Sequence, residues 1–160
     1  MRIYDNLVEK YSNTRDPIEP PGIHSLPALE ACIERPKSGL LRRVFFKSLP
    51  YKGAVITHGL ICSHPFCNGN KRVAFAAACS FFELNGYCLI IANGEVVPFL
   101  LKIAQHELDV AKIASYYGQK LISAHEWQNK ELDKMPTWIE KDSADIKYRK
   151  VKRRYFPPNR

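Results

Sequence analysis

The sequence predicts an all-α fold, mostly helical, with a short flap or hairpin near residues 36–50. Residues 73–84 carry an almost uninterrupted apolar pattern that is typical of a buried helix. The pattern stops at Asn85-Gly86, a common helix ending because glycine adopts the left-handed cap conformation without a steric clash. Apolar residues at helical spacing predict further helices, which cover residues 3–12, 26–35, 51–62, 95–104 and 110–121.

Flanking residues indicate where several of these helices begin. Ser25 and Asp109 are each placed to cap the helix that follows, because a side-chain oxygen can accept a hydrogen bond from a free first-turn N–H. Residues 88–92 favour one short strand, with a turn at Asn93-Gly94 after it. Pro98 is expected within the first turn of the next helix, where a missing N–H costs little.

The length and composition are those of one globular domain. The chain has 160 residues, of which 46% are hydrophobic, and this is enough for a substantial core. No apolar run is long enough to span a membrane and no secretory signal is visible, so we expect a cytoplasmic protein. The five cysteines are an odd number, which favours reduced thiols.

The positive charge is concentrated at the C-terminal end. The chain has a formal net charge of +8, and residues 147–160 contain seven Lys or Arg and no acid. Tyr148, Tyr155 and Phe156 lie among these cations, and such a mixture suits phosphate backbones and unstacked bases. A nucleic acid and an acidic protein segment are both candidate partners of this tail, and a disordered solubilising tail is the alternative.

Residues 64–72 are the stretch richest in chemistry. They form a loop that leads into the N-terminus of the apolar helix, and either Asn68 or Asn70 is expected to cap it. The N–H groups of Gly69, Asn70 and Lys71 are expected to point outward at the positive end of the helix dipole. Such an end is an anion site, and a glycine lets a ligand approach the backbone closely.

Charged and titratable side chains complete this pattern. Lys71 and Arg72 add positive charge, and an arginine can bind a phosphate bidentately. His64 lies at the other end of the loop and is the group there that titrates near neutral pH. A general base beside an anion site suits phosphoryl or nucleotidyl transfer to a hydroxyl. The alternatives are solvated cations and a structural histidine.

A zinc site is a further alternative for this region. His58, Cys62, His64 and Cys67 are all of ligand type. However, tight zinc sites usually show paired ligands at short spacing, and no second half of such a set appears elsewhere in the sequence.

The run from His64 to Arg72 resembles the signature of Fic/Doc proteins, His-x-Phe-x-(Asp/Glu)-Gly-Asn-(Gly/Lys)-Arg. Its lysine form, with Lys71, resembles the Doc (death-on-curing) toxin branch. The resemblance is clearest over residues 20–121 and is supported by flanking matches at Gly22-Ile23, Leu29-Glu30, Ile33, Arg35-Pro36, His58-Gly59-Leu60 and Leu84-Asn85-Gly86-Tyr87. We therefore expect a Fic/Doc-like domain over 1–121 and a C-terminal extension over 122–160.

This resemblance implies a function. Doc-like proteins are small helical toxins of toxin–antitoxin modules. The family transfers part of a nucleotide, ATP or another, to a protein hydroxyl: Fic members usually transfer AMP, and Doc transfers phosphate. By resemblance, His64 is the general base and Phe66 anchors the loop in the core. The phosphate-binding positions are Gly69, Asn70, Lys71 and Arg72.

One position departs from the family pattern. The family's acidic residue, which holds Mg²⁺, is replaced by Asn68. An amide offers a carbonyl oxygen but no charge, so we expect weak Mg²⁺ binding that depends largely on the nucleotide phosphates. The sequence thus predicts a Doc-like toxin that transfers phosphate from a nucleotide to a target protein. AMP transfer and a catalytically weak binding module, acting through a partner or nucleic acid, are the alternatives.

The segment over 40–50 matches the family's flap in position. By resemblance this flap presents the target segment, and Arg42, Arg43 and Lys47 then serve to dock an acidic target or phosphate. A solvated basic edge is the alternative.

Overall fold

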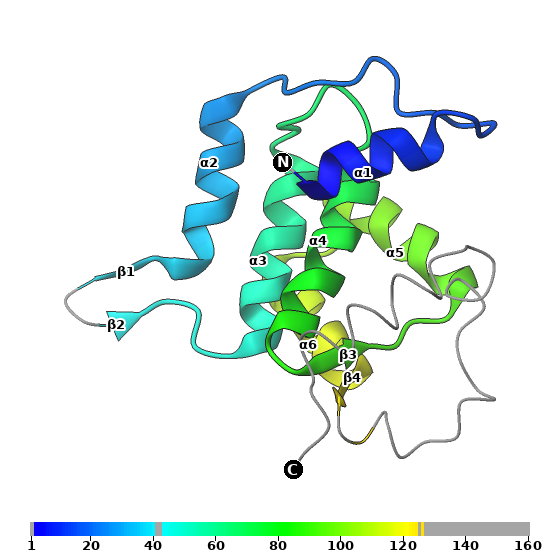
Figure 1. Ribbon diagram of the computed structural model, residues 1–160. Helices are drawn as coiled ribbons and strands as arrows, with labels where there is room; N and C mark the ends of the chain where they lie inside the picture. Colours follow the sequence, from blue (N-terminus) through cyan, green and yellow to red (C-terminus); the bar gives the residue numbers. More distant parts are fainter. Residues whose placement is uncertain (1, 41–42, 125, 127–160) are drawn as a thin grey trace, which may run out of the picture.

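The computed structural model describes residues 2–40, 43–124 and 126. The described residues form six α-helices and two small antiparallel sheets (Figure 1). The helices are α1 (Arg2–Tyr11), α2 (Leu26–Glu34), α3 (Leu49–Cys62), α4 (Asn70–Leu84), α5 (Asn93–Ala104) and α6 (Val110–Lys120). The strands are β1 (Gly39–Leu40), β2 (Arg43–Val44), β3 (Tyr87–Leu89) and β4 (Leu121–Ser123), and a 3₁₀ turn covers Arg35–Lys37. The predicted helical fold is confirmed.

The predicted caps form as expected. The Ser25 hydroxyl accepts from the Ala28 N–H at 3.3 Å, and Asp109 Oδ1 accepts from the Lys112 N–H at 2.8 Å. Helix α3 begins two residues earlier than predicted, because Ser48 caps it through the Tyr51 N–H.

The predicted turn at Asn93-Gly94 is wrong, since both residues belong to α5. Extended backbone at Ala92 places its carbonyl to accept from the Glu95 N–H at 2.9 Å, and this starts the helix before the glycine. Pro98 therefore lies beyond the first turn, inside the helix.

Helix α3 lies at the centre of the molecule and packs against α4 and α6. Gly53 of α3 lies against Phe82 of α4, where an added Cβ would meet the ring at 2.3 Å. Phe82 is fully buried and packs edge-to-face against Tyr117 of α6, with ring centroids 5.3 Å apart. Tyr117 and Thr57 share a buried hydrogen bond of 2.8 Å. One contiguous core thus joins the three helices.

The chain beyond α6 returns to the body of the fold. Gly86 has a φ of 81° and ends α4 in the left-handed conformation, as predicted. Strand β3 follows it and pairs antiparallel with β4, with Leu89 opposite Leu121. The expected domain boundary after 121 therefore falls at the first residue of a paired strand. Most of the extension, including the tail 147–160, lies outside the described residues.

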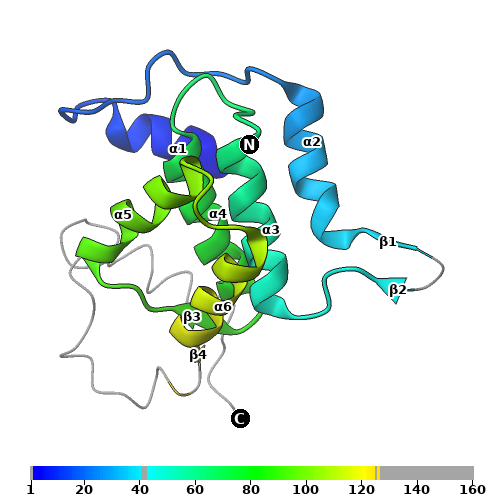
Figure 2. The same cartoon turned by 180° about the vertical axis from the view of Figure 1, so that it is seen from behind.

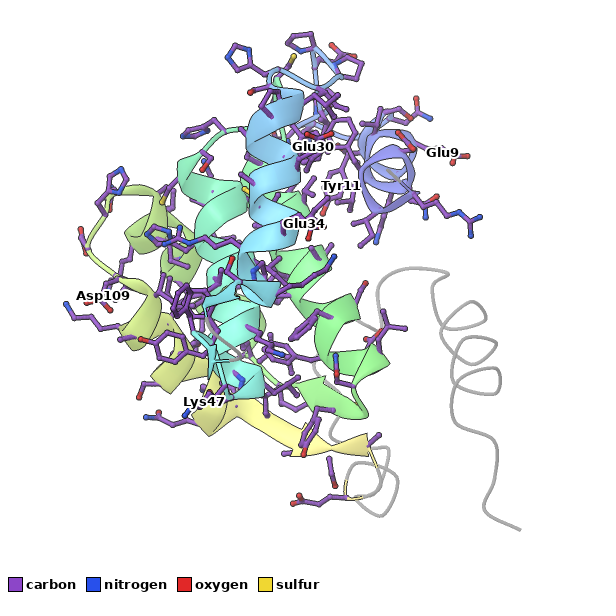
Figure 3. All side chains as sticks on the ribbon, turned by 90° about the vertical axis from the view of Figure 1, so that its left-hand side faces the viewer. Glu9, Tyr11, Glu30, Glu34, Lys47 and Asp109 are labelled. Atoms are coloured by element: carbon purple, nitrogen blue, oxygen red, sulfur yellow. The ribbon has the colours of Figure 1, made fainter. Side chains whose placement is uncertain are left out.

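The hairpin β1–β2 forms in the predicted place and lies far from the loop of residues 63–69. Helix α3 separates them, since it begins five residues after β2 and ends at residue 62. Figures 1 and 2 show the hairpin projecting beside the start of α3, while the loop lies at the opposite end of that helix. In Figure 3, Lys47 is likewise well separated from Tyr11 of α1. Arg42 lies outside the described residues.

Two further features bear on the expectations. Among the described helices, none is long and apolar enough to cross a bilayer. None of the five cysteines, all of them described residues, forms a disulfide, and they range from the buried Cys32 to the exposed Cys67.

Candidate active site

The loop of residues 63–69, here called the motif loop, joins α3 to α4. Its Pro65 and Phe66 are buried, and the Phe66 ring stacks on Tyr4 of α1 at 4.2 Å between centroids. The Asn70 side chain turns back into the loop: its Oδ1 accepts from the Phe66 N–H at 3.0 Å and its Nδ2 donates to the Phe66 carbonyl at 2.8 Å. These contacts hold the loop in place at Phe66, whose buried ring anchors it.

A second segment, residues 16–25, runs antiparallel to the motif loop and is here called the strap. It belongs to the connection between α1 and α2, which passes over the same end of the molecule as the loop (Figures 1 and 2). The Pro65 carbonyl accepts from the N–H groups of His24 and Ser25, at 2.8 and 3.1 Å. The strap therefore begins to hold the loop at the residue after His64.

Further backbone contacts continue this pairing along the loop. The Cys67 N–H donates to the Gly22 carbonyl at 3.0 Å, and Ile23 forms an isolated antiparallel bridge with Phe66. The Gly22 N–H in turn donates to the Tyr4 hydroxyl at 2.8 Å. The sequence pattern did not predict the strap: within it, only the cap at Ser25 and the match at Gly22-Ile23 stood out.

The cap of α4 differs from the prediction. Gly69 is the N-cap, with a φ of 80°, and neither Asn68 nor Asn70 caps the helix with its side chain. The Gly69 N–H does not point outward, because it donates to Asn68 Oδ1 at 2.6 Å. Ile18 packs so closely on Gly69 that an added Cβ would lie 3.0 Å from it. Glycine is required here by both its conformation and this contact.

The helix N-terminus still offers donors to an anion. The N–H groups of Asn70, Lys71 and Arg72 have no intrahelical acceptor, since they belong to the first turn. They lie at the positive end of the helix dipole. The Lys71 side chain is exposed and adds positive charge beside them. Of the predicted cradle, the backbone of Asn70 and Lys71 is available, while the Asn70 side chain is not.

Arg72 lies half-buried against the N-terminal part of the chain. Its guanidinium donates to the Asp16 carbonyl at 2.6 Å and lies 3.4 Å from the Asp16 carboxylate. It also covers the Tyr11 ring, 4.8 Å from the centroid. The Asp16 carboxylate is 87% exposed, so this ion pair is well solvated and contributes about 1 kcal/mol or less. An incoming phosphate can therefore replace the carboxylate at low cost.

His64 is exposed at the start of the motif loop. Its φ is 45°, a left-handed backbone conformation that is uncommon for residues other than glycine. The conformation directs the chain from the end of α3 into the buried Pro65.

A pocket of about 610 Å³ joins these groups. His64 and Arg72 both line it, and so do residues of α1, the strap and α5. Its wall on α5 is apolar and includes Val97 and Leu101, whose side chains are 62% and 42% exposed. The lining residues are Tyr11, Asp16, His64, Cys67, Asn68, Gly69, Asn70, Lys71, Arg72, Val97, Leu100 and Leu101.

The residues of the pocket do not form a Mg²⁺ site. Asn68 uses both ends of its amide, since Oδ1 accepts from Gly69 and Nδ2 donates to the Glu19 carbonyl at 2.7 Å. The carboxylate that lines the pocket, Asp16, faces Arg72. Within the part of the chain that the structure describes, no three His, Cys, Asp or Glu side chains are grouped to hold a metal ion.

The zinc alternative also fails. His64 and Cys67 line the pocket, whereas Cys62 lies beside His58 and His106, with Sγ–N distances of 3.7 and 3.9 Å. Burial raises the pKa of the Cys62 thiol and lowers the pKa of His58, which favours the uncharged forms of both groups.

A helical domain in which a helix N-terminus offers free N–H groups, and in which a histidine and an arginine line one pocket, has features in common with proteins that transfer groups from phosphates. The model of the Fic/DOC family matches residues 1–82, just over half of the 160 residues, and the chain belongs to this family. The family covers nucleotidyl and phosphate transfer to proteins, with a nucleotide as co-substrate. The comparison with curated proteins gives no match.

Proposed function

We propose that this protein is a Doc-type toxin that transfers a phosphate from a nucleotide, such as ATP, to a hydroxyl of a target protein. The observation that carries the proposal is that His64 and Arg72, at the two ends of the family motif, line the same pocket. This arrangement supports a general base and a phosphate-binding cation that act on one bound nucleotide.

The phosphates of the nucleotide are bound at the start of α4. Arg72 exchanges the solvated Asp16 carboxylate for a phosphate, and the N–H groups of Asn70 and Lys71 donate to its oxygens. These donors are fixed by the helix and face charge that increases on the oxygens during transfer. Stabilisation of this charge is the main contribution that a protein makes to phosphoryl transfer.

His64 is the general base in this proposal. The target hydroxyl oxygen attacks the γ-phosphorus, its proton passes to a ring nitrogen of His64, and the bond to the β-phosphate oxygen breaks. The nucleoside diphosphate leaves with that oxygen. A neutral imidazole is needed to accept this proton.

The apolar wall on α5 supports a nucleotide as the ligand of this pocket. Val97, Leu100 and Leu101 offer an apolar surface to a nucleobase, while the lining residues from the start of α4 are polar and cationic. The volume of about 610 Å³ lies within the range of pockets that hold small molecules and cofactors.

Phosphate transfer is favoured over AMP transfer because of Lys71. AMP-transferring members of the family usually have glycine there, and a side chain in the first turn restricts how the phosphates approach the helix. Label transfer from γ-labelled ATP to protein distinguishes the two reactions. Transfer of the α-label instead would establish AMP transfer and refute the phosphate assignment.

Two substitutions test the roles of the motif residues. His64→Ala is expected to lower transfer about 10²- to 10⁴-fold, the usual contribution of a general base, and to leave nucleotide binding unchanged. Arg72→Ala is expected to weaken nucleotide binding about 10- to 100-fold, because a charge-assisted hydrogen bond is lost. Transfer is followed with radiolabelled nucleotide, and binding is followed by calorimetry.

The matched control is His24→Ala, which removes another exposed imidazole at the same end of the molecule. The strap uses only the backbone N–H of His24, and this atom is retained in the variant. The proposal is wrong if His64→Ala retains full transfer while His24→Ala loses it.

A binding module with weak catalysis is the second candidate. It is favoured by Asn68, whose amide is fully used within the protein, where the family's acidic metal ligand is expected. An antitoxin is the proposed protein partner in either case. Tight nucleotide binding with no transfer of either label to any protein would favour this second candidate.

A further inference from the structure

We infer that Asn68 is a positioning residue that fastens the motif loop to the strap, and that an aspartate at this position would loosen the site instead of supplying a metal ligand. The inference concerns how the loop is held. It rests on the proposed function only where an effect on nucleotide binding is expected.

The orientation of the Asn68 amide is fixed by its two partners. Oδ1 faces the Gly69 N–H at 2.6 Å, and Nδ2 faces the Glu19 carbonyl at 2.7 Å. A backbone N–H only donates and a carbonyl oxygen only accepts. The reversed amide would place two donors together and two acceptors together, so each partner independently gives the same assignment.

An ionised carboxylate satisfies only one of these partners. It accepts from the Gly69 N–H as the amide does, but its second oxygen has no proton to donate. That oxygen would then lie about as close to the Glu19 carbonyl oxygen as Nδ2 does now, at 2.7 Å. Two acceptors at this separation repel each other, so either the loop or the strap has to move.

Asn68 lies at the centre of the pairing between strap and loop. On one side the backbone bond of Cys67 to Gly22 continues toward His64. On the other side Ile18 packs on Gly69, and Arg72 binds Asp16. Movement of the strap at Glu19 therefore displaces the packing at the helix cap and the partner of the guanidinium. The part of the pocket formed by the helix cap and Arg72, where phosphate would bind, then changes shape.

It follows that Asn68 is matched to its surroundings and is not simply a lost ligand. An amide is the group of this size that can accept at one atom and donate at the other without a charge. Phosphate binding then relies on Arg72 and the first-turn N–H groups, while any Mg²⁺ is bound through the nucleotide.

The test compares Asn68→Asp, Asn68→Ala and wild type. Asn13→Asp is the control, because it makes the same charge change at an exposed asparagine just before the strap. Thermal unfolding and amide hydrogen exchange of the Gly69 and Cys67 N–H groups are measured between pH 7 and pH 4. Neither readout requires nucleotide, target or transfer.

At pH 7 we expect Asn68→Asp to unfold at a temperature several degrees below the control and to exchange the Cys67 N–H faster. Asn68→Ala loses both bonds without adding repulsion, so we expect a smaller loss. The two variants differ further in pH dependence. Repulsion raises the pKa of the introduced carboxyl in the folded state, so the deficit of Asn68→Asp is largest above that pKa and shrinks as the pH falls through it. A protonated carboxyl donates to the Glu19 carbonyl, whereas alanine shows no such recovery.

Calorimetry with ATP and Mg²⁺ completes the test. We expect Asn68→Asp to bind ATP more weakly than wild type and the control. The inference is overturned if Asn68→Asp unfolds at the same temperature as the control and gains affinity for ATP with Mg²⁺. It is also overturned if Asn68→Ala is less stable than Asn68→Asp at pH 7. If Asn68→Asp does not fold at pH 7, the exchange rates of Asn68→Ala and the recovery at pH 4 decide. Absence of nucleotide binding in wild type would refute the proposed function and leave the stability results standing.

Discussion

Asn68 and Asn70 lie two positions apart and use their amides in opposite directions. Asn68 binds outward, to the strap, whereas Asn70 binds inward, to both backbone groups of Phe66. Sequence reasoning recognised that these residues belong to a helix N-terminus but assigned them to capping and phosphate binding. In the sequence, several backbone groups are near enough for each amide to bind. Which of them it binds is decided by how the loop folds.

The inward bonds of Asn70 carry a prediction. Asn70→Ala leaves the N–H and carbonyl of Phe66 without partners in a buried place, at a cost of about 1–3 kcal/mol for each group. Asn85→Ala is the control, because its Nδ2 donates to the carbonyl four residues earlier in the same way, but at an exposed site. We expect a change within about 0.5 kcal/mol there. Chemical denaturation measures both, and equal losses would contradict the prediction.

At the scale of the elements, apolar spacing and capping residues predicted the six described helices, several of which begin at a side-chain cap. The contacts between elements could be predicted less well from the sequence. The approach of α3 to α4 depends on Gly53, which has no side chain to produce a pattern. The strap was missed for a related reason: most of its bonds to the loop join backbone atoms of segments far apart in the sequence.

The contact of α3 with α4 at Gly53 carries a further prediction. Gly53→Ala places a methyl group 2.3 Å from the Phe82 ring, and we expect a loss of about 1–3 kcal/mol through overpacking. Gly94→Ala in α5 is the control, since an added Cβ has no neighbour within 4 Å there, and alanine is the better helix former. We expect a gain of up to about 1 kcal/mol. The expectation fails if Gly53→Ala is as stable as wild type in thermal unfolding.

For the whole molecule, the positive charge is concentrated in one part of the sequence. Seven of the basic residues fall within 147–160, outside the described residues, and the remainder of the chain is nearly neutral. The motif predicted which residues gather at the pocket, because they are close in sequence. It did not predict the contributions of α1, the strap and α5, which come from distant parts of the chain.

The charge distribution predicts how the protein meets polyanions. Removing 147–160 lowers the formal net charge from +8 to +1, so we expect the full chain to be retained on a heparin column at about 0.15 M salt and the shortened chain to pass through. The elution salt concentration is the measurement. Equal retention of both would show that another surface binds the polyanion.

Because the strap is paired through its backbone, the side chains of its exposed residues are open to substitution. Glu19 and His24 hold the loop by a carbonyl and an N–H, which nearly every amino acid supplies, and both side chains are exposed. Ile18 and Gly22 are constrained by packing and by conformation. Substitution of the exposed strap residues is therefore expected to cost little stability. A library randomised at positions 19 and 24, with 18 and 22 kept, would retain the backbone pairing that holds the motif loop.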